Sequence, residues 1–273
     1  YLAPYSRGEP ATPAWQYSLT NLNAAAADPN PHDLVFAADD KAYLLQYGGN
    51  RVVVVDPTAG GISSFETGSL DLSAYANVQD GSGTSGTPQM TRGVIVDGRL
   101  YVVMQRLDSN WTPQQAYVAV FDTGTDQELE ASPSDDSHKG IPLTVRNPVT
   151  IQYDSANDQL LIGAVGDYYG GKNGGVEAID LADTDCSDSS CYGTSVIIDD
   201  DAADATHGRV NDIAVVDGDT AYLIGYQAWQ DNDLYAFDPA TGAIEQEGGS
   251  NRVIGGLEGA SLADIAVSPG GQL

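Results

Sequence analysis

Residues 30–47 read NPHDLVFAADDKAYLLQY, and their pattern determines the architecture because it returns three times along the chain. Each copy is an apolar strand, a polar turn rich in Asp, Gly or Asn, and a second apolar strand. The other copies are PQMTRGVIVDGRLYVVMQR (88–106), NPVTIQYDSANDQLLIGAV (147–165) and RVNDIAVVDGDTAYLIGYQ (209–227). Aligned on His32, Met90, Val149 and Asn211, they lie 58, 59 and 62 residues apart, and a weaker copy, SLADIAVSPGGQL, aligns on Ala263. Repeats of this length made only of strands and hairpins are typical of a β-propeller.

Each copy continues into a third strand that ends in Asp, and then into a turn and a fourth, more polar strand. The third strands end at Asp56, Asp122, Asp180 and Asp238, and the fourth strands are expected in ISSFETG, QELEAS, TSVIID and AIEQEGG. An Asp at a strand end accepts a hydrogen bond from the backbone two residues on and so favours a turn. The sequence therefore predicts an all-β protein, a propeller of four-stranded antiparallel blades with the first strands at the centre.

The repeat predicts one propeller domain over residues 1–273. Blades are expected at about 31–85, 86–145, 146–207 and 208–256, with partial blades at 1–30 and 257–273. A ring shares a blade between its ends to remove open sheet edges, so we expect the native chain to extend beyond both Tyr1 and Leu273. A complete five-bladed ring with one degenerate blade is the alternative. An α/β fold is disfavoured because the one helix-friendly run, NLNAAAADPN, is broken by Pro29.

The chain carries 39 acidic and 11 basic residues, which gives a net charge of −28. Nucleic acid and anionic membrane surfaces are excluded as partners, because binding them requires Lys and Arg to neutralise phosphates. The acids are spread along the chain, which favours a role in solubility over attraction of a basic partner. No apolar run is long enough to predict a transmembrane segment.

Cys186 and Cys191 are the only cysteines, and they flank a short loop between a third and a fourth strand. Metal binding would require further Cys or nearby His, so a local disulfide is predicted. A disulfide indicates an oxidising compartment outside the cytosol.

Ligands of propellers bind where the loops enter the first strands, at the mouth of the central channel. Eight residues with hydrogen-bonding side chains occupy those loops: His32, Gln89, Arg92, Arg146, Asn147, His207, Arg209 and Asn211. Together they supply donors suited to a carboxylate or another small anion. The alternative is that they satisfy backbone groups and water in the channel.

A second candidate surface is aromatic. Trp111, Tyr168, Tyr169 and Trp229 fall in or beside loops between second and third strands. Aromatic side chains there are suited to a sugar or a protein partner, since such residues dominate binding interfaces. Packing against adjacent blades is the alternative.

Calcium is the inorganic ion that the acidic loops favour, because hard cations take carboxylate and carbonyl oxygens. The candidate ligands are Asp183, Asp185, Asp188, Asp199 and Asp201, although no loop matches the twelve-residue calcium motif. His32, His207 and Met90 could form a copper-like set, which makes a redox or hydrolytic metalloenzyme the alternative function. No nucleophile motif is present, so no catalytic residue is predicted.

Three segments resemble the YncE-like, YVTN-type β-propeller proteins of bacterial cell surfaces. They are NPHDLVFAADDKAYLLQYGGNRVVVVDPTAG, GVIVDGRLYVVMQRLD and AYVAVFDTGTDQELE, and a fourth segment, LDLSAYANVQDG, shares the resemblance. The resemblance implies the propeller fold and a secreted, cell-surface or periplasmic address, often as a lipoprotein, and it implies no catalytic residues. The predicted function is a binding or interaction module for a protein or a small molecule; a structural subunit of an extracellular assembly is a further alternative.

Overall fold

The computed structural model describes residues 5–6, 9–13, 16–76, 78–80, 83–135, 137–169, 171–186, 191–202, 205–228, 231–255 and 261–268. Strands dominate these residues, and the helical segments among them are three single turns: η1 (Leu19–Asn21), α1 (Ile62–Phe65) and η2 (Ser73–Tyr75). The all-β architecture that the repeat predicts is confirmed. No helix in this described portion is long and apolar enough to cross a membrane.

Blades 1 and 2 are antiparallel sheets whose strands follow the chain order outward. Blade 1 consists of β3 (Pro31–Ala38), β4 (Lys41–Gln46), β5 (Arg51–Val55) and β6 (Glu66–Asp71). Blade 2 consists of β9 (Met90–Val96), β10 (Arg99–Met104) and β11 (Tyr117–Asp122), with its outer edge shared by β12 (Gln127–Glu128) and β13 (Ile141–Pro142). The hairpin of β7 (Val78–Asp80) and β8 (Gly83–Ser85) lies between them in the sequence.

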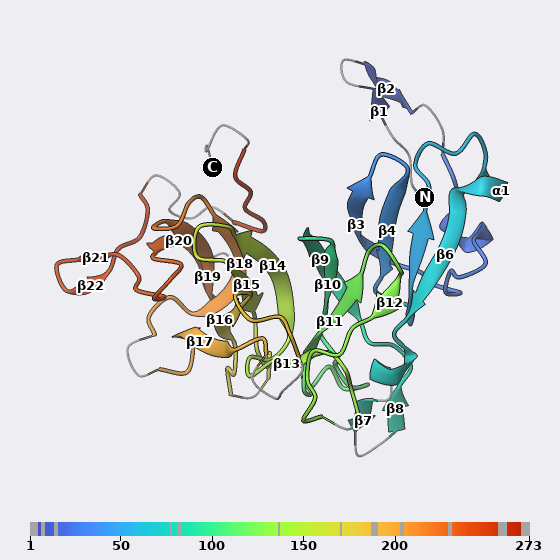
Figure 1. Ribbon diagram of the computed structural model, residues 1–273. Helices are drawn as coiled ribbons and strands as arrows, with labels where there is room; N and C mark the ends of the chain where they lie inside the picture. The colour runs from blue at the N-terminus through green and yellow to red at the C-terminus, as the bar shows by residue number, and fades with distance from the viewer. Residues whose placement is uncertain are drawn as a thin grey trace.

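Blades 3 and 4 repeat the same order. Blade 3 consists of β14 (Pro148–Asp154), β15 (Gln159–Ala164), β16 (Gly175–Asp180) and β17 (Thr194–Asp199). Blade 4 consists of β18 (Arg209–Val215), β19 (Ala221–Ala228) and β20 (Asp231–Phe237). The first strands are neighbours in space, β3 beside β9, β9 beside β14 and β14 beside β18, so the blades follow one another around a common centre (Figure 1).

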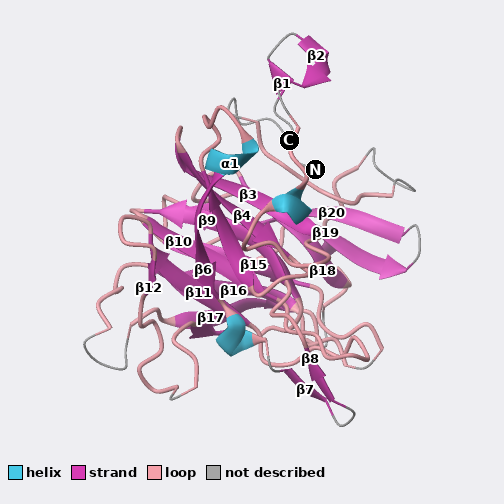
Figure 2. Ribbon diagram, turned by 90° about the vertical axis from the view of Figure 1, so that its right-hand side faces the viewer, coloured by secondary structure: helices cyan, strands magenta, loops and turns pink. Residues whose placement is uncertain are grey.

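Two small hairpins complete the strands. One is formed by β1 (Tyr5–Ser6) and β2 (Glu9–Pro13) and projects from the body of the molecule (Figure 2). The other is formed by β21 (Gln246–Glu247) and β22 (Ser250–Asn251) beyond blade 4.

The hydrophobic core is divided into layers between successive blades. One cluster joins blades 1 and 2, a second joins blades 2 and 3, and a third joins blades 3 and 4. A sheet packed on both sides must be apolar on both faces, so the inner strands are runs of Val, Leu, Ile and Ala without polar alternation. All six residues of β15 are buried, as this arrangement requires.

The outer strands depart from the predicted segments in three blades. In blade 2, only Gln127–Glu128 of the predicted segment QELEAS forms a strand, and Ile141–Pro142 completes the edge. In blade 1, Ile62–Phe65 forms a helical turn and the fourth strand begins only at Glu66, with Phe65 buried beneath it. In blade 4, the predicted strand AIEQEGG reaches the sheet as an isolated bridge from Ile244 to Phe237, while Gln246–Glu247 turns into its own hairpin. Outer strands face solvent on one side, so burial constrains their position less than it does for the inner strands.

The predicted disulfide is confirmed, with the Cα atoms of Cys186 and Cys191 5.0 Å apart. Cys191 packs in the layer between blades 2 and 3 beside the buried Tyr192. The disulfide therefore fixes the loop that leads into β17.

Candidate functional site

The loops predicted to bind a ligand lie at one end of the blades, which we call the mouth face. The start of each first strand pairs with the end of the second strand, as Pro31 does with Gln46 and Pro148 with Ala164. The entrance to each first strand and the loop between the second and third strands therefore share this end, the lower edge of Figure 1 near β7, β8 and β13. The opposite end, where first and third strands finish, we call the turn face.

A left-handed residue stands directly before the first strand of every blade. These residues are Asn30 (φ 39°), Gln89 (φ 58°), Asn147 (φ 56°) and Gly208 (φ 75°). Asn and Gly adopt this conformation more readily than other residues. The carbonyl oxygens of Asn30, Gln89 and Asn147 each accept a hydrogen bond from the residue after the second strand of their own blade, at 3.0–3.1 Å. The residue at this position therefore helps to join the first strand to the second.

Two of the predicted ligand-binding residues, Gln89 and Asn147, have side chains that hold their own loops. Asn147 is fully buried and its Nδ2 donates to the carbonyl oxygen of Gly166 at 3.0 Å. The Gln89 side-chain oxygen accepts a hydrogen bond from the backbone N–H of Leu107. Gln89 and Asn147 are polar because their side chains hydrogen-bond to the backbone of these loops. In the sequence, this role is indicated by the polar residue that recurs before each apolar strand.

The residues that follow lie in β-bulges. The pairing of the first strand with the second skips His32, Val149 and Asn211, and in blade 2 it shifts between Met90 and Gly93. A bulge leaves a residue out of the ladder and re-aims its side chain, and bulges are frequent beside binding sites. The anchor residues of the repeat therefore mark a local break in each first strand at the mouth face.

Three arginines of the mouth face direct their guanidinium groups at backbone carbonyl oxygens. The distances from Nη1 to the accepting oxygen are 3.0 Å for Arg92, 2.9 Å for Arg146 and 3.3 Å for Arg209. None of the three has a carboxylate within 4.0 Å among the residues the structure describes. All three are half-buried. A guanidinium carries five N–H donors, so each keeps donors for a further acceptor.

Buried acids lie near these arginines and are held by backbone N–H groups. The Glu177 Oε2 atom accepts from the backbone of Thr144 at 2.8 Å and of Val145 at 3.0 Å, and burial raises the pKa of Glu177. Burial also raises the pKa of Asp200 to about 6, against the opposing charges of Lys172 and Arg209. The arginines thus feel nearby negative charge without forming ion pairs.

Aromatic side chains cover part of the same face. The His32 ring stacks on Tyr47 with the ring centroids 4.4 Å apart. Burial, and then the charge of the Tyr168 phenol, raise the pKa of Tyr47 to about 12. Tyr168 is 51% exposed and Tyr169 is 85% exposed. These three tyrosines and His32 offer stacking surfaces beside the arginines.

Trp111 is presented on a rigid loop. Its side chain is 56% exposed, and its backbone has φ 65°, an unusual conformation for a bulky residue. The Asp108 carboxylate holds the loop by accepting from the backbone of Asn110 at 2.8 Å and of Thr112 at 2.9 Å. Trp229 lies outside the described residues.

The geometry gives no support to the copper-like set. Met90 is fully buried in the layer between blades 1 and 2. His207 is buried and packs against Tyr235 with the centroids 6.5 Å apart, and His32 is engaged with Tyr47. His138 lies between two tyrosine rings, away from the first strands.

A set of residues that the sequence alone did not single out ties neighbouring first strands together. Asp33 Oδ2 accepts from the backbone of Gly93 in the next blade at 3.0 Å. Asp212 Oδ2 accepts from Ile265, in the segment after blade 4, at 3.0 Å. Thr91 and Thr150 make the corresponding contacts, to the carbonyl of Pro148 and to Asp212. Each of these side chains stands one residue after an anchor, and the recurring Asp or Thr there is visible in the sequence.

A side-chain hydrogen bond joins Asp212 and Asp264 at this centre. Burial, and then the hydrogen bond with Asp264, raise the pKa of Asp212 to about 6. The same hydrogen bond lowers the pKa of Asp264, with Arg92 contributing less.

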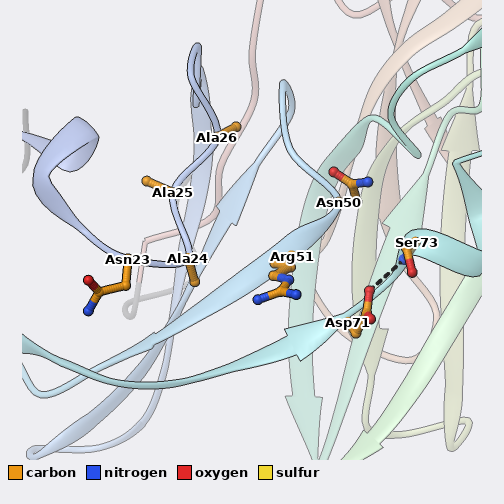
Figure 3. A pocket seen from close by; sticks show the side chains of 8 residues that line it. All are labelled: Asn23, Ala24, Ala25, Ala26, Asn50, Arg51, Asp71 and Ser73. Atoms are coloured by element: carbon orange, nitrogen blue, oxygen red, sulfur yellow. Dashed lines mark hydrogen bonds between the residues drawn. The ribbon is translucent and has the colours of Figure 1, made fainter.

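A hollow of about 300 Å³ lies beside blade 1, between residues 23–26 and the start of β5. Figure 3 shows Arg51 and Asp71 on the neighbouring strands β5 and β6, with Ser73 donating its backbone N–H to Asp71 at 2.9 Å. The hydrogen bonds from Ser73, and to a lesser extent the charge of Arg51, lower the pKa of Asp71. Because the two charges balance each other, this hollow is a weaker candidate than the arginines of the mouth face.

The predicted calcium ligands fall into two groups. Asp183 lies in the disulfide loop, where its Oδ1 accepts from the backbone of Asp185 at 3.2 Å, and Asp188 lies outside the described residues. Asp199 and Asp201 flank Asp200 at the end of β17, and these three form the one group of three His, Cys, Asp or Glu residues in the described chain that is placed to hold a metal ion.

Comparison with known proteins identifies the fold and leaves the family open. No family model matches the sequence, and no curated protein matches it. Among solved structures, hydrazine synthase of Kuenenia stuttgartiensis matches with a TM-score of 0.52 at 15% identity, covering 87% of this chain and 53% of that one. The nidogen/laminin complex matches with a TM-score of 0.51 at 12% identity, covering 89% and 70%. A functionally unknown protein of Desulfotomaculum acetoxidans matches with 0.50 at 13% identity, covering 88% and 61%.

The similar structures are propeller proteins. This chain therefore has a β-propeller fold. Because it spans only about half to two thirds of the length of two of these proteins, and because identity is so low, the likeness extends to the fold alone.

Proposed function

We propose that this propeller is a binding module that takes a carboxylate-bearing ligand, either a small molecule or an acidic segment of a protein, at the mouth face. The observation that carries the proposal is that Arg92, Arg146 and Arg209 form no ion pair in the described residues. In a chain with a net charge of −28, these three half-buried guanidinium groups have no carboxylate within 4.0 Å in the described portion. Guanidinium groups bind carboxylates strongly because they can donate two parallel hydrogen bonds.

The aromatic residues extend the proposed site. Tyr168, Tyr169 and Trp111 are exposed and belong to loops of the same face. Exposed aromatic residues on a rigid scaffold are favourable contact points for a partner, since they bury a large area at little entropic cost. A peptide with acidic and apolar residues would use both the arginines and the aromatic residues.

The proposed address is outside the cytosol, as a secreted, cell-surface or periplasmic bacterial protein of the YncE-like type. The Cys186–Cys191 disulfide supports this address, because disulfides persist in oxidising compartments. The excess of acidic residues suits a protein that must stay soluble outside the cell.

Isothermal titration calorimetry with citrate, succinate and sulfate tests the proposal. We expect saturable binding of citrate, weakened at least tenfold in the Arg92→Gln/Arg209→Gln variant. Arg252→Gln is the matched control, because Arg252 is already paired with Glu245 at 2.7 Å and lies on blade 4's outer side. Absence of saturable binding of all three anions, or equal weakening in the control, would overturn the proposal.

A further inference from the structure

The turn after β17 brings three consecutive carboxylates together. One oxygen each from Asp199, Asp200 and Asp201 lies within 4.8 Å of the other two. Asp199 and Asp201 are exposed, whereas Asp200 is fully buried. Three negative charges at this separation repel one another, and the repulsion is strongest at the buried member, where water screens it least.

One oxygen of the buried carboxylate has no partner. Asp200 Oδ1 accepts from the backbone N–H of Gly174 at 2.8 Å. Asp200 Oδ2 is buried and receives no hydrogen bond from the described part of the chain. Buried carboxylate oxygens are otherwise almost always paired or bound to a metal ion, because the lost hydration of an unpaired one is not replaced.

The nearby cationic side chains, Lys172 and Arg209, form no ion pair with the cluster in the described residues. Lys172 Nζ donates to the backbone oxygen of Asp200 at 2.6 Å, which leaves the carboxylates to other partners. Asp201 accepts hydrogen bonds from the backbone of Lys172 at 3.2 Å and of Asn173 at 2.8 Å. No Lys or Arg side chain lies within 4.0 Å of the three carboxylates in the described residues.

We propose that Asp199, Asp200 and Asp201 bind one calcium ion at the end of β17. The donors are all oxygens, which selects a hard cation. A hollow of about 200 Å³ adjoins Asp199, Asp201 and Asn173 and leaves room for water ligands. Calcium fits better than magnesium, because three carboxylates from consecutive residues of one turn do not impose the strict octahedral geometry that magnesium requires.

The ion would fasten the loop between β15 and β16 to the end of β17. Asp200 and Asp201 already hold that loop through Gly174, Lys172 and Asn173. The same loop carries Tyr168 and Tyr169, so calcium would order the aromatic part of the mouth face. The calcium site itself does not depend on anion binding by the arginines.

Calorimetric titration of the EDTA-treated chain with calcium chloride at about 0.15 M KCl tests the proposal. We expect one site with a dissociation constant of about 10⁻⁴–10⁻³ M, the range of open extracellular sites. Calcium at tenfold that concentration should raise Tm by about 2–4 °C, since it binds only the folded chain. Magnesium should bind at least tenfold more weakly.

Two variants and a control distinguish this site from diffuse attraction to an acidic protein. Asp199→Asn/Asp201→Asn should weaken binding at least tenfold, whereas Asp183→Asn/Asp185→Asn changes the charge equally and should leave it unchanged. Asp200→Asn should abolish the calcium-induced rise in Tm while leaving Tm in EDTA unchanged or higher, because it removes a buried unpaired charge. The absence of a saturable calcium site, or equal weakening by the control substitutions, would overturn the proposal, whatever the result with citrate.

Discussion

The acidic side chains of the turn face are satisfied within their own turns, whereas the basic side chains of the mouth face keep donors to spare. Asp56, Asp180 and Asp238 each accept a backbone hydrogen bond from two residues on, at 2.8 Å. Of the basic residues there, Lys41 is paired with Asp126 at 2.8 Å, and Arg99 donates a hydrogen bond to the Thr184 hydroxyl. At the mouth face, Arg92, Arg146 and Arg209 bond only to backbone carbonyls among the residues that the structure describes.

This contrast indicates where function lies in a strongly charged chain. Much of the acidity of the turn face belongs to turn chemistry that recurs in every blade. At the mouth face, the charged groups of the three arginines and of the Asp199–Asp201 turn form no ion pairs in the described residues. Four substitutions test this division, taken in decreasing order of their effect on stability.

Asn147→Ala should be the most damaging of the four. It places alanine, which adopts a positive φ less readily than asparagine, at φ 56°, and it leaves the carbonyl of Gly166 without its buried donor. Together these effects should lower the free energy of unfolding by about 2–4 kcal/mol, measured by urea denaturation. Asn147→Gly keeps the backbone conformation and should cost about 1–2 kcal/mol. Equal losses for both variants would show that backbone conformation is unimportant there.

The sequence predicts the blades well because burial on both sides demands apolar inner strands at a fixed period. It predicts the outer strands less well, since Ile62–Phe65 and Ile244 are only lightly constrained by packing. It also identifies the mouth-face loops. It does not reveal the direction of each side chain: Gln89 and Asn147 hold loops, while Arg92 keeps its donors. The role of the Asp or Thr after each anchor residue can be recognised only once the first strands are known to be neighbours in space.

The Asp212–Asp264 pair should make stability depend on pH at the centre of the molecule. The pKa of Asp212 is raised to about 6, so the folded chain holds a proton that the unfolded chain releases near pH 4. Its contribution is therefore fully present below about pH 4 and is lost as the pH rises through about 6. The lowered pKa of Asp264 acts in the opposite sense, with stability lost only as the pH falls below its ordinary range.

Between about pH 5 and pH 7.5, Asp212 should account for a loss of about 1–1.5 kcal/mol in the free energy of unfolding. Urea denaturation at both pH values in the native chain and in Asp212→Asn measures it. The variant should be less stable at pH 5 and should show a flatter dependence on pH. An unchanged slope in Asp212→Asn would place the titrating group elsewhere.

Asp56→Ala tests the turn face and should have a smaller effect. The Asp56 carboxylate accepts from the Thr58 backbone at 2.8 Å and from the Thr58 hydroxyl at 2.6 Å, both near the surface. Loss of these bonds should cost about 0.5–1 kcal/mol in urea denaturation, because water replaces them. Citrate binding should be unchanged, since Asp56 lies at the far end of the blade. A change in citrate affinity would contradict the division between the two faces.

Trp111→Gly should have the smallest effect on stability and a large effect on binding. The Trp111 side chain is 56% exposed, and its φ of 65° suits glycine better than tryptophan, so the free energy of unfolding should stay within about 0.5 kcal/mol or rise. Because stability does not require tryptophan at this position, the proposed function assigns the Trp111 side chain to contact with a partner. Pulldown from the source organism's extracellular fraction, with the native chain and the variant side by side, measures that contact. Identical partners and yields for both would remove Trp111 from the binding surface and leave the arginines as its centre.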